Sequence, residues 1–281
     1  MEPSVRPAIA AGTFYPGTRE ALASAVADLL GEVDRRCAPL DSPLGLIAPH
    51  AGYPYSGPTA AAGYREVVRN GRPDVVVILG ANHTGFGEPL SLDDHRAWWT
   101  PLGETPVDRD LVSRLEQSGI RAAPDAFVRE HSIEVHLPFV QVLWGVETPI
   151  LPICVQPLPH DTLSDAAEAL ADALTDRSSM LLVASSDFTH YEPDEAARRL
   201  DRSAIEPILA LDSTRFLDLC RAERLSICGA GAIALLIEVA ARLGITDTQL
   251  IDYSTSGDTS ADRSAVVGYA AISFSRRNHG S

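Results

Sequence analysis

Apolar and polar residues alternate along the chain with two different periods. Uninterrupted runs rich in β-branched residues, such as Val-Val-Val-Ile-Leu at 75–79, predict strands that are covered on both faces. Stripes that recur every three or four residues predict helices, and Thr18 is a suitable N-cap for the first of them. The predicted strands are 44–48, 74–79, 148–155, 180–184, 249–254 and 266–273, the predicted helices are 18–30, 59–70, 108–117, 132–144, 163–174, 194–211, 214–223 and 230–243, and 90–102 is a predicted hairpin.

The order of these elements predicts the class of fold. Strands alternate with helices, which is typical of α/β proteins with helices on both faces of one sheet. We therefore expect a three-layer α/β sandwich with a central, largely parallel or mixed sheet. The chain has 281 residues, 45% of them apolar, and it contains no repeat and no long linker. These features predict a single domain over residues 1–281.

The balance of charges excludes several classes of protein. The formal net charge is −15 at pH 7, and all 23 basic residues are arginine. We do not expect an acidic chain without a long basic cluster to bind nucleic acid. The absence of lysine excludes Schiff-base catalysis, pyridoxal phosphate attachment and a phosphate-binding P-loop.

The cysteines and the apolar stretches indicate the compartment. Four cysteines, at positions 37, 154, 220 and 228, form no C-x-x-C pair and are interpreted as reduced thiols. The first residues contain no apolar signal core, and Glu238 interrupts the apolar stretch 229–241. Because a membrane span needs about 20 apolar residues, we expect a cytoplasmic protein without a membrane partner.

Three residues that are far apart in the sequence stand at the ends of predicted elements. His50 follows the strand 44–48, His83 follows the strand 74–79 after a short turn, and Cys228 precedes the helix 230–243. In open α/β sheets such positions gather in one pocket. Two imidazoles and a thiolate are suitable ligands for iron, copper or zinc. The alternative is that both histidines make structural hydrogen bonds and that Cys228 is a core residue.

The position of Cys228 adds to the metal hypothesis. A cysteine at the start of a helix lies at the positive end of the helix dipole, which favours the thiolate. A thiolate binds metals and attacks electrophiles, so Cys228 is also a candidate catalytic residue. Cys37, Cys154 and Cys220 have no such setting.

A second cluster, Ser-Ser-Asp-Phe-Thr-His-Tyr at 185–191, directly follows the strand 180–184. Asp187 and His190 are three residues apart, so the carboxylate can orient the imidazole if the loop turns like a helix. This spacing predicts His190 as a catalytic acid or base and Asp187 as its catalytic partner. The alternative is that Asp187 caps a turn and that His190 is an ordinary polar residue.

The segment 48–57 surrounds His50 with glycines and prolines, which predicts a rigid turn. Such a turn would hold a metal ligand at a fixed angle. Tyr53 and Tyr55 in this segment are candidates for a substrate or peptide pocket, with packing as the alternative.

The segment 129–138 contains two histidines that are five residues apart. On a helix this spacing places them on different faces, which excludes an H-E-x-x-H zinc site. We expect His131 near the pocket. His136, Glu130 and Glu134 are interpreted as structural residues or as hydrogen-bond partners of ligands.

Together these motifs resemble those of the Memo family, including the prokaryotic AmmeMemoRadiSam system protein B. The resemblance implies an α/β fold like that of class III extradiol (LigB-type) dioxygenases. It also implies a pocket built from His50, His83, Asp187, His190 and Cys228. The matching motifs cover nearly the whole chain, at 11–16, around residue 50, and at 78–83, 129–141, 185–191, 227–229 and 253–257.

The resemblance also has consequences for cofactor and partners. The dioxygenases have glutamate as the third metal ligand, whereas the matching position here is Cys228. A thiolate disfavours ring cleavage and shifts the preference towards softer metals such as copper or zinc without excluding iron. We expect a divalent transition metal, with iron or copper favoured and zinc as the alternative. The implied partners are an unknown small molecule or peptide, and the radical SAM and companion proteins of the AmmeMemoRadiSam system.

Three functions are consistent with these residues. The first is a metal-dependent redox or oxygenase-like enzyme with His50, His83 and Cys228 as ligands. The second is a non-enzymatic module that binds a peptide or protein in an inherited pocket. The third is a zinc-dependent hydrolase, because two histidines and a cysteine leave a fourth position for water.

Overall fold

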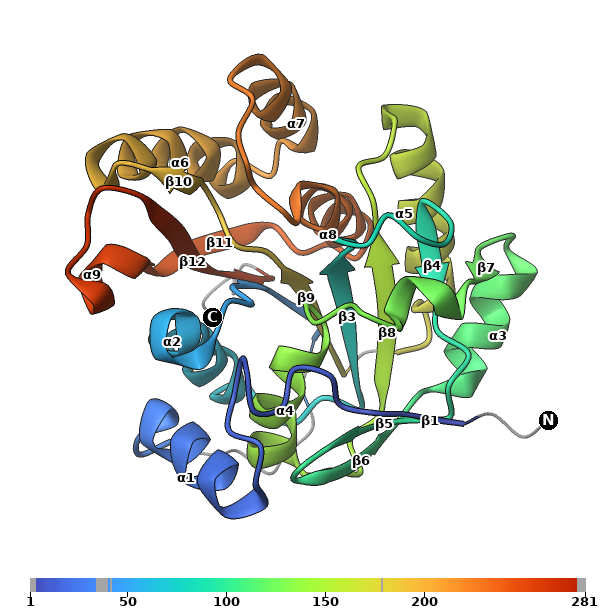
Figure 1. Ribbon diagram of the computed structural model, residues 1–281. Helices are drawn as coiled ribbons and strands as arrows, with labels where there is room; N and C mark the ends of the chain where they lie inside the picture. Colours follow the sequence, from blue (N-terminus) through green and yellow to red (C-terminus); the bar gives the residue numbers. More distant parts are fainter. Residues whose placement is uncertain (1–3, 34–39, 41, 178, 277–281) are drawn as a thin grey trace, which may run out of the picture.

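A mixed β-sheet forms the centre of the molecule, with helices on both faces (Figure 1). The computed structural model describes residues 4–33, 40, 42–177 and 179–276. Within these ranges the main sheet has nine strands in the order β10-β12-β2-β9-β3-β8-β4-β7, and β11 pairs with β12. Their bounds are β2 Leu44–Ala48, β3 Val75–Ala81, β4 Leu90–Leu92, β7 Arg121–Ala122, β8 Ile150–Val155, β9 Met180–Ser185, β10 His190–Glu192, β11 Asp247–Thr255 and β12 Val266–Ser275.

Four parallel strands, β2, β9, β3 and β8, make up the middle of the sheet. Every residue of these four strands is buried, as expected for strands covered by helices on both sides. The flanking strands β12 and β4 run antiparallel to β2 and β8. Because the four central strands point the same way, the loops after their carboxyl ends lie at one edge of the sheet.

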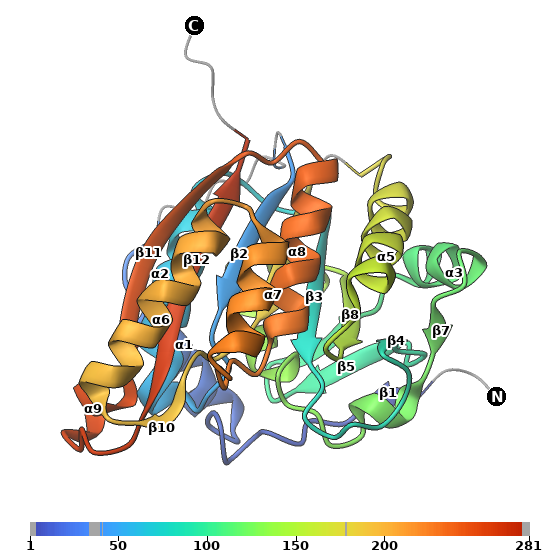
Figure 2. The ribbon, with the colours of Figure 1, turned by 90° about the horizontal axis from the view of Figure 1, so that it is seen from above.

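Helices form the two outer layers, which Figure 2 shows on opposite sides of the sheet. One layer contains α5 (His160–Ala173), α6 (Asp194–Leu209), α7 (Ser213–Ala222) and α8 (Ala230–Arg242), and the other contains α1 (Arg19–Leu30), α2 (Tyr53–Val68) and α4 (Leu137–Trp144). The remaining elements are α3 (Arg109–Gln117), α9 (Ser256–Ser260), the 3₁₀ helices η1 (Pro124–Phe127) and η2 (Glu134–His136), and a small sheet of β1 (Val5–Arg6), β5 (Ala97–Thr100) and β6 (Gly103–Pro106). In the described ranges no helix has the length and apolar composition needed to cross a membrane.

The predicted fold class is confirmed, since a mostly parallel, mixed sheet lies between two helical layers. Two local predictions are wrong. The helix expected at 59–70 already begins at Tyr53, so the second half of the expected rigid turn at 48–57 is helical. Pro54 lies in the first turn of α2, where a helix needs no backbone N–H, so it does not break the helix. The expected hairpin at 90–102 is divided, because β4 joins the main sheet while β5 pairs with β6.

A buried ion pair fastens the N-terminal segment to the body of the molecule. Arg6 Nη1 lies 2.7 Å from Glu134 Oε2, and the two side chains are 3% and 0% exposed. The guanidinium also lies over the ring of Trp98, 3.9 Å from its centroid. Glu134 accepts further hydrogen bonds from the amides of residues 9–10 and from the hydroxyl of Tyr15. Glu134 is therefore a structural residue, as the sequence indicates.

Asp93 and His95, between β4 and β5, form a second charged pair. Asp93 Oδ1 lies 2.7 Å from His95 Nδ1, and this hydrogen bond outweighs partial burial and raises the pKa of His95 above its ordinary value. A group with a pKa raised by folding stabilises the folded state below its unfolded pKa of about 6.5, and it loses this contribution as pH rises through the folded pKa.

We therefore expect His95→Gln to destabilise the protein more at about pH 6 than at about pH 8. Urea denaturation of both proteins at several pH values measures the difference in free energy of unfolding. A difference that does not change with pH would contradict a charge-linked role for His95.

Candidate metal centre

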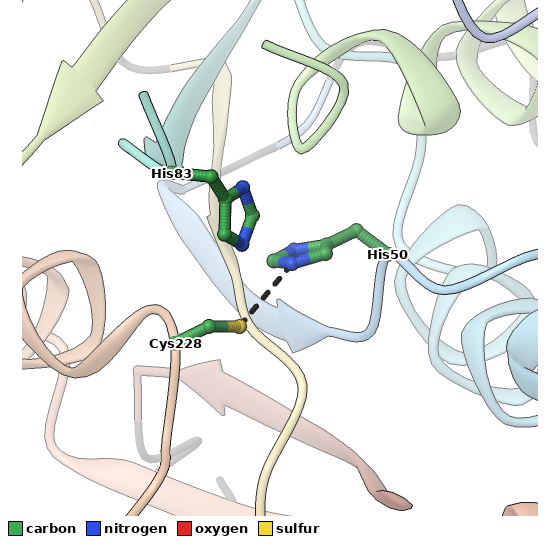
Figure 3. Close-up of side chains that lie close together, drawn as sticks. All are labelled: His50, His83 and Cys228. Carbon is green, nitrogen blue, oxygen red and sulfur yellow. Dashed lines mark hydrogen bonds between the residues drawn. The ribbon is translucent and has the colours of Figure 1, made fainter. Parts of the chain in front are cut away.

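His50, His83 and Cys228 meet at the carboxyl edge of the sheet (Figure 3). His50 lies two residues after β2, His83 two residues after β3, and Cys228 two residues before α8. One nitrogen of each imidazole and the sulfur all lie within 4.8 Å of one another, and His50 Nε2 is 3.2 Å from Cys228 Sγ. The predicted convergence of these three side chains is confirmed.

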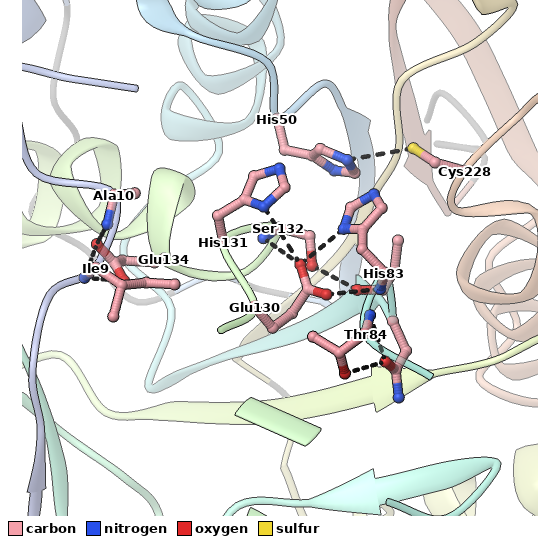
Figure 4. Close-up of polar contacts among 12 residues, drawn as sticks. Ile9, Ala10, His50, His83, Thr84, Glu130, His131, Ser132, Glu134 and Cys228 are labelled. Carbon is pink, nitrogen blue, oxygen red and sulfur yellow. Dashed lines mark hydrogen bonds and ion pairs between the residues drawn. The ribbon is translucent and has the colours of Figure 1, made fainter. Parts of the chain in front are cut away.

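A buried carboxylate holds the His83 imidazole (Figure 4). Glu130 Oε1 lies 2.9 Å from His83 Nδ1, and Glu130 Oε2 accepts the His83 amide at 2.7 Å. Burial opposes both charges, but this pairing keeps the pKa of His83 above and that of Glu130 below the usual value. A carboxylate only accepts, so Nδ1 carries a proton, and in the neutral form of the ring His83 Nε2 is left free for a ligand.

The His50 imidazole lies deeper and is neutral. Its side chain is almost fully buried, and its Nδ1 lies 2.7 Å from Ser185 Oγ at the end of β9. Burial lowers the pKa of His50 well below its ordinary value, and the neighbouring His83 and His131 add to this effect. A neutral imidazole is the form that binds metals.

Cys228 is half-buried, and its sulfur accepts a hydrogen bond from the Asp187 amide at 3.2 Å. Burial raises the pKa of the thiol, and the Asp187 carboxylate raises it further. The expectation that the start of α8 favours a thiolate is therefore wrong for the protein without a bound metal. Cys154 and Cys220 also have raised pKa values because of burial, and Cys37 lies outside the described residues.

The three donors fit a transition metal. Two imidazole nitrogens and one sulfur are the ligand types that suit iron, copper and zinc. Three protein ligands leave at least one position open, and His83, with 35% of its side chain exposed, lies on the solvent side of the centre.

Asp187 and His190 lie near the centre but are not hydrogen-bonded to each other in the described part of the chain. Asp187 Oδ1 accepts the amides of His50 and Ala51, and burial raises its pKa to about 6. His190 Nδ1 lies 2.7 Å from the carbonyl oxygen of Phe188. The loop continues into β10 instead of turning like a helix, so Asp187 does not orient His190 through a hydrogen bond. The two side chains still interact electrostatically, and their catalytic roles stay a prediction.

The three candidate pocket residues have different surroundings. Tyr53 is 5% exposed and donates its hydroxyl to the Val135 carbonyl at 2.8 Å, which agrees with the packing alternative, and its pocket role stays a prediction. Tyr55, in the same helix, is 44% exposed, and its role stays a prediction. His131 stacks on His83, with ring centroids 4.8 Å apart, as expected for a residue at the centre. Burial lowers the pKa of His131 to about 4.

Two residues close to the centre received no role in the sequence interpretation. Ser185 hydrogen-bonds His50, and Phe14 packs against His131 with ring centroids 4.2 Å apart. Ser185 belongs to the segment 185–191, in which the sequence pattern assigns roles to Asp187 and His190 only. A polar residue at the end of an otherwise apolar buried strand was the available signal for its importance.

Gly229 allows the start of α8 to approach β9 closely. A Cβ atom on Gly229 would lie 2.6 Å from Ser186 Cβ and even closer to the Ser185 carbonyl oxygen. We expect Gly229→Ala to lower the free energy of unfolding by about 1–3 kcal/mol and to displace Cys228 from His50. Denaturant unfolding measures the first effect and a crystal structure of the variant the second. Unchanged stability would contradict this close fit.

Comparisons with known proteins agree with this architecture. A family profile described as "Memo-like protein" matches residues 6–273. A "MEMO1 family protein" of Desulfurococcus amylolyticus is 40% identical over 279 residues, which cover 96% of this chain and 98% of the relative. A protein of the same description from Thermotoga maritima is 38% identical and covers 96% and 99%. Among solved structures, the uncharacterized protein JW3007 from Escherichia coli K12 is similar in fold alone, with a TM-score of 0.57, 10% identity, and 82% and 98% coverage.

Proposed function

The chain belongs to the Memo family, and from this premise we propose that it is a metal-dependent redox enzyme of the oxygenase-like kind. In this proposal His50, His83 and Cys228 bind a transition metal, with iron or copper favoured. The observation that carries the proposal is that the three donor atoms lie within 4.8 Å of one another while each His Nδ1 is engaged elsewhere. Iron or copper would supply one-electron chemistry with dioxygen, and zinc would not.

His190 is the proposed proton-transfer residue. Its Nδ1 lies 2.7 Å and 2.8 Å from the carbonyl oxygens of Phe188 and Ser226. Carbonyl oxygens only accept hydrogen bonds, so Nδ1 carries the proton and Nε2 of the neutral ring is free to accept one. Asp187 supports the proposed ligands through hydrogen bonds, since its carboxylate accepts the His50 amide and its own amide donates to the sulfur of Cys228.

The test begins with protein purified without chelator. Metal content is measured first, followed by anaerobic titration with Fe²⁺, Cu⁺ and Zn²⁺. We expect one metal ion per chain and, with iron or copper and a reductant such as ascorbate, dioxygen consumption that zinc-loaded protein does not show. His190→Gln should bind metal like the wild type and consume dioxygen more slowly.

Other outcomes point to the remaining two functions. Tight binding of zinc alone, together with hydrolysis of activated esters, would replace the proposal by a zinc-dependent hydrolase. No binding of any of the three metals would contradict the proposal and favour a non-enzymatic peptide- or protein-binding module.

A further inference from the structure

We propose that Ser185 is a positioning residue that fixes the tautomer of His50 and so directs His50 Nε2 towards Cys228. This inference rests on the proposed metal centre and adds a residue that hydrogen-bonds one of its ligands. Ser185 Oγ has three close neighbours: the Ser132 carbonyl oxygen at 2.6 Å, His50 Nδ1 at 2.7 Å and His136 Nε2 at 2.9 Å. All four residues are buried.

The positions of the protons follow from counting donors and acceptors. A serine hydroxyl has one hydrogen to donate and can accept two hydrogen bonds. The Ser132 carbonyl oxygen accepts only, so at 2.6 Å the hydroxyl hydrogen must lie between these two oxygens. Ser185 then has only lone pairs to offer, and both imidazoles must donate to it. His50 therefore carries its proton on Nδ1, and His136 carries its proton on Nε2.

The same assignment satisfies the atoms at both ends of this chain of hydrogen bonds. His136 Nδ1 is left with a lone pair and lies 3.1 Å from the hydroxyl of Tyr64, which donates to it. His50 Nε2 is left with a lone pair that lies 3.2 Å from Cys228 Sγ. The opposite tautomer of His50 would set two lone pairs, on Nδ1 and on Ser185 Oγ, against each other in a buried site. Polar atoms that are left unpaired in a buried site destabilise the folded state.

The two histidine ligands of the proposed centre therefore have different hydrogen-bond partners at Nδ1. His83 is held by the Glu130 carboxylate, and His50 is held by a neutral hydroxyl whose own hydrogen goes to a backbone carbonyl. In both cases Nδ1 is protonated and Nε2 is free. Loss of such a support from a metal ligand typically costs about 10–100-fold in metal affinity.

The first experiment tests the tautomers without any metal. Two-bond ¹⁵N–¹H correlation spectra of metal-free wild-type protein distinguish a protonated from an unprotonated ring nitrogen. We expect a neutral His50 with the proton on Nδ1 and a neutral His136 with the proton on Nε2. A proton on His50 Nε2 would overturn the inference, whether or not the protein binds metal.

The second experiment tests the consequence, with Co²⁺ as the probe and its thiolate charge-transfer absorption as the signal. Ser185→Ala should lower Co²⁺ affinity by about 10–100-fold, and Ser185→Thr, which keeps the hydroxyl, should restore most of it. Ser179→Ala is the matched control, since Ser179 is buried just before the opposite end of β9 and hydrogen-bonds the Arg72 carbonyl. It should leave Co²⁺ affinity unchanged.

The outcomes separate this inference from the proposed function. If wild-type protein does not bind Co²⁺, the metal centre is contradicted, while the tautomer spectra still decide the role of Ser185. If wild type and Ser185→Ala bind Co²⁺ equally well, the metal centre stands and the positioning role of Ser185 is overturned. Equal losses in Ser185→Ala and Ser179→Ala would also overturn it, because they would reflect a general effect on packing.

Discussion

Cys228→Ser should lower the affinity of the protein for Fe²⁺ or Cu⁺ by more than about 100-fold, which is the upper end of the effect of removing a ligand's hydrogen-bond partner. The serine hydroxyl is a poor ligand at neutral pH, and its side chain is close to cysteine in volume. The free energy of unfolding of the metal-free protein should therefore change by less than about 1.5 kcal/mol. Anaerobic titration against a competing chelator measures the affinity, and denaturant unfolding measures the stability.

Cys220→Ser is the control for this prediction. Cys220 lies in α7 and is not among the clustered donors, so its replacement should leave metal affinity unchanged. If Cys228→Ser binds metal as tightly as the wild type, the thiol is structural. The peptide- or protein-binding interpretation would then be the better one.

Arg6→Met should lower the free energy of unfolding by about 3–5 kcal/mol, the usual cost of removing one partner of a buried ion pair. The side chain of Glu134 is 0% exposed, and the variant would leave it buried without the guanidinium that lies 2.7 Å away. The variant also loses the contact of the guanidinium with the ring of Trp98. Guanidinium chloride unfolding, monitored by circular dichroism, measures the loss.

Arg96→Met provides the comparison on the surface. The Arg96–Glu104 pair has nearly the same kind of contact, at 3.0 Å, but its side chains are 53% and 47% exposed. An exposed pair contributes about 0–1 kcal/mol, so this variant should be close to wild type. If both variants lose the same small amount, the buried pair does not hold the N-terminal segment in place.

The elements of the sheet could be predicted from sequence because their signal is local. The run at 75–79 is apolar at every position, and only a strand buried on both faces needs such a run. The start of α2 could not be predicted in this way. Pro54 and Gly57 are typical of turns, and Pro54 is compatible with a helix only because Tyr53 begins it. Pairing partners that are far apart in the chain, such as β4 and β8, depend on contacts that the local pattern does not encode.

The same difference between local patterns and long-range contacts decides which features of the candidate site could be predicted. His50, His83 and Cys228 could be placed together because a general rule brings strand ends and helix starts to one edge of a parallel sheet. The state of the Cys228 thiol could not be predicted, because it depends on burial and on the distance to Asp187. The hydrogen-bond partners of His190 are backbone carbonyl oxygens. Every residue has such an oxygen, so the residue types do not reveal which ones bind His190.

The Arg6–Glu134 pair also affects the order in which the chain reaches its final form. Its two residues are 128 positions apart in the chain. A ribosome adds about 5–20 residues per second, so on the order of 10 s pass between the addition of Arg6 and the addition of Glu134. Throughout that time the part of the receiving surface that contains His131 and Glu134, which contact Phe14 and Tyr15, has not been made. The part of the protein that is synthesised first can therefore dock completely only after residue 134 has been added.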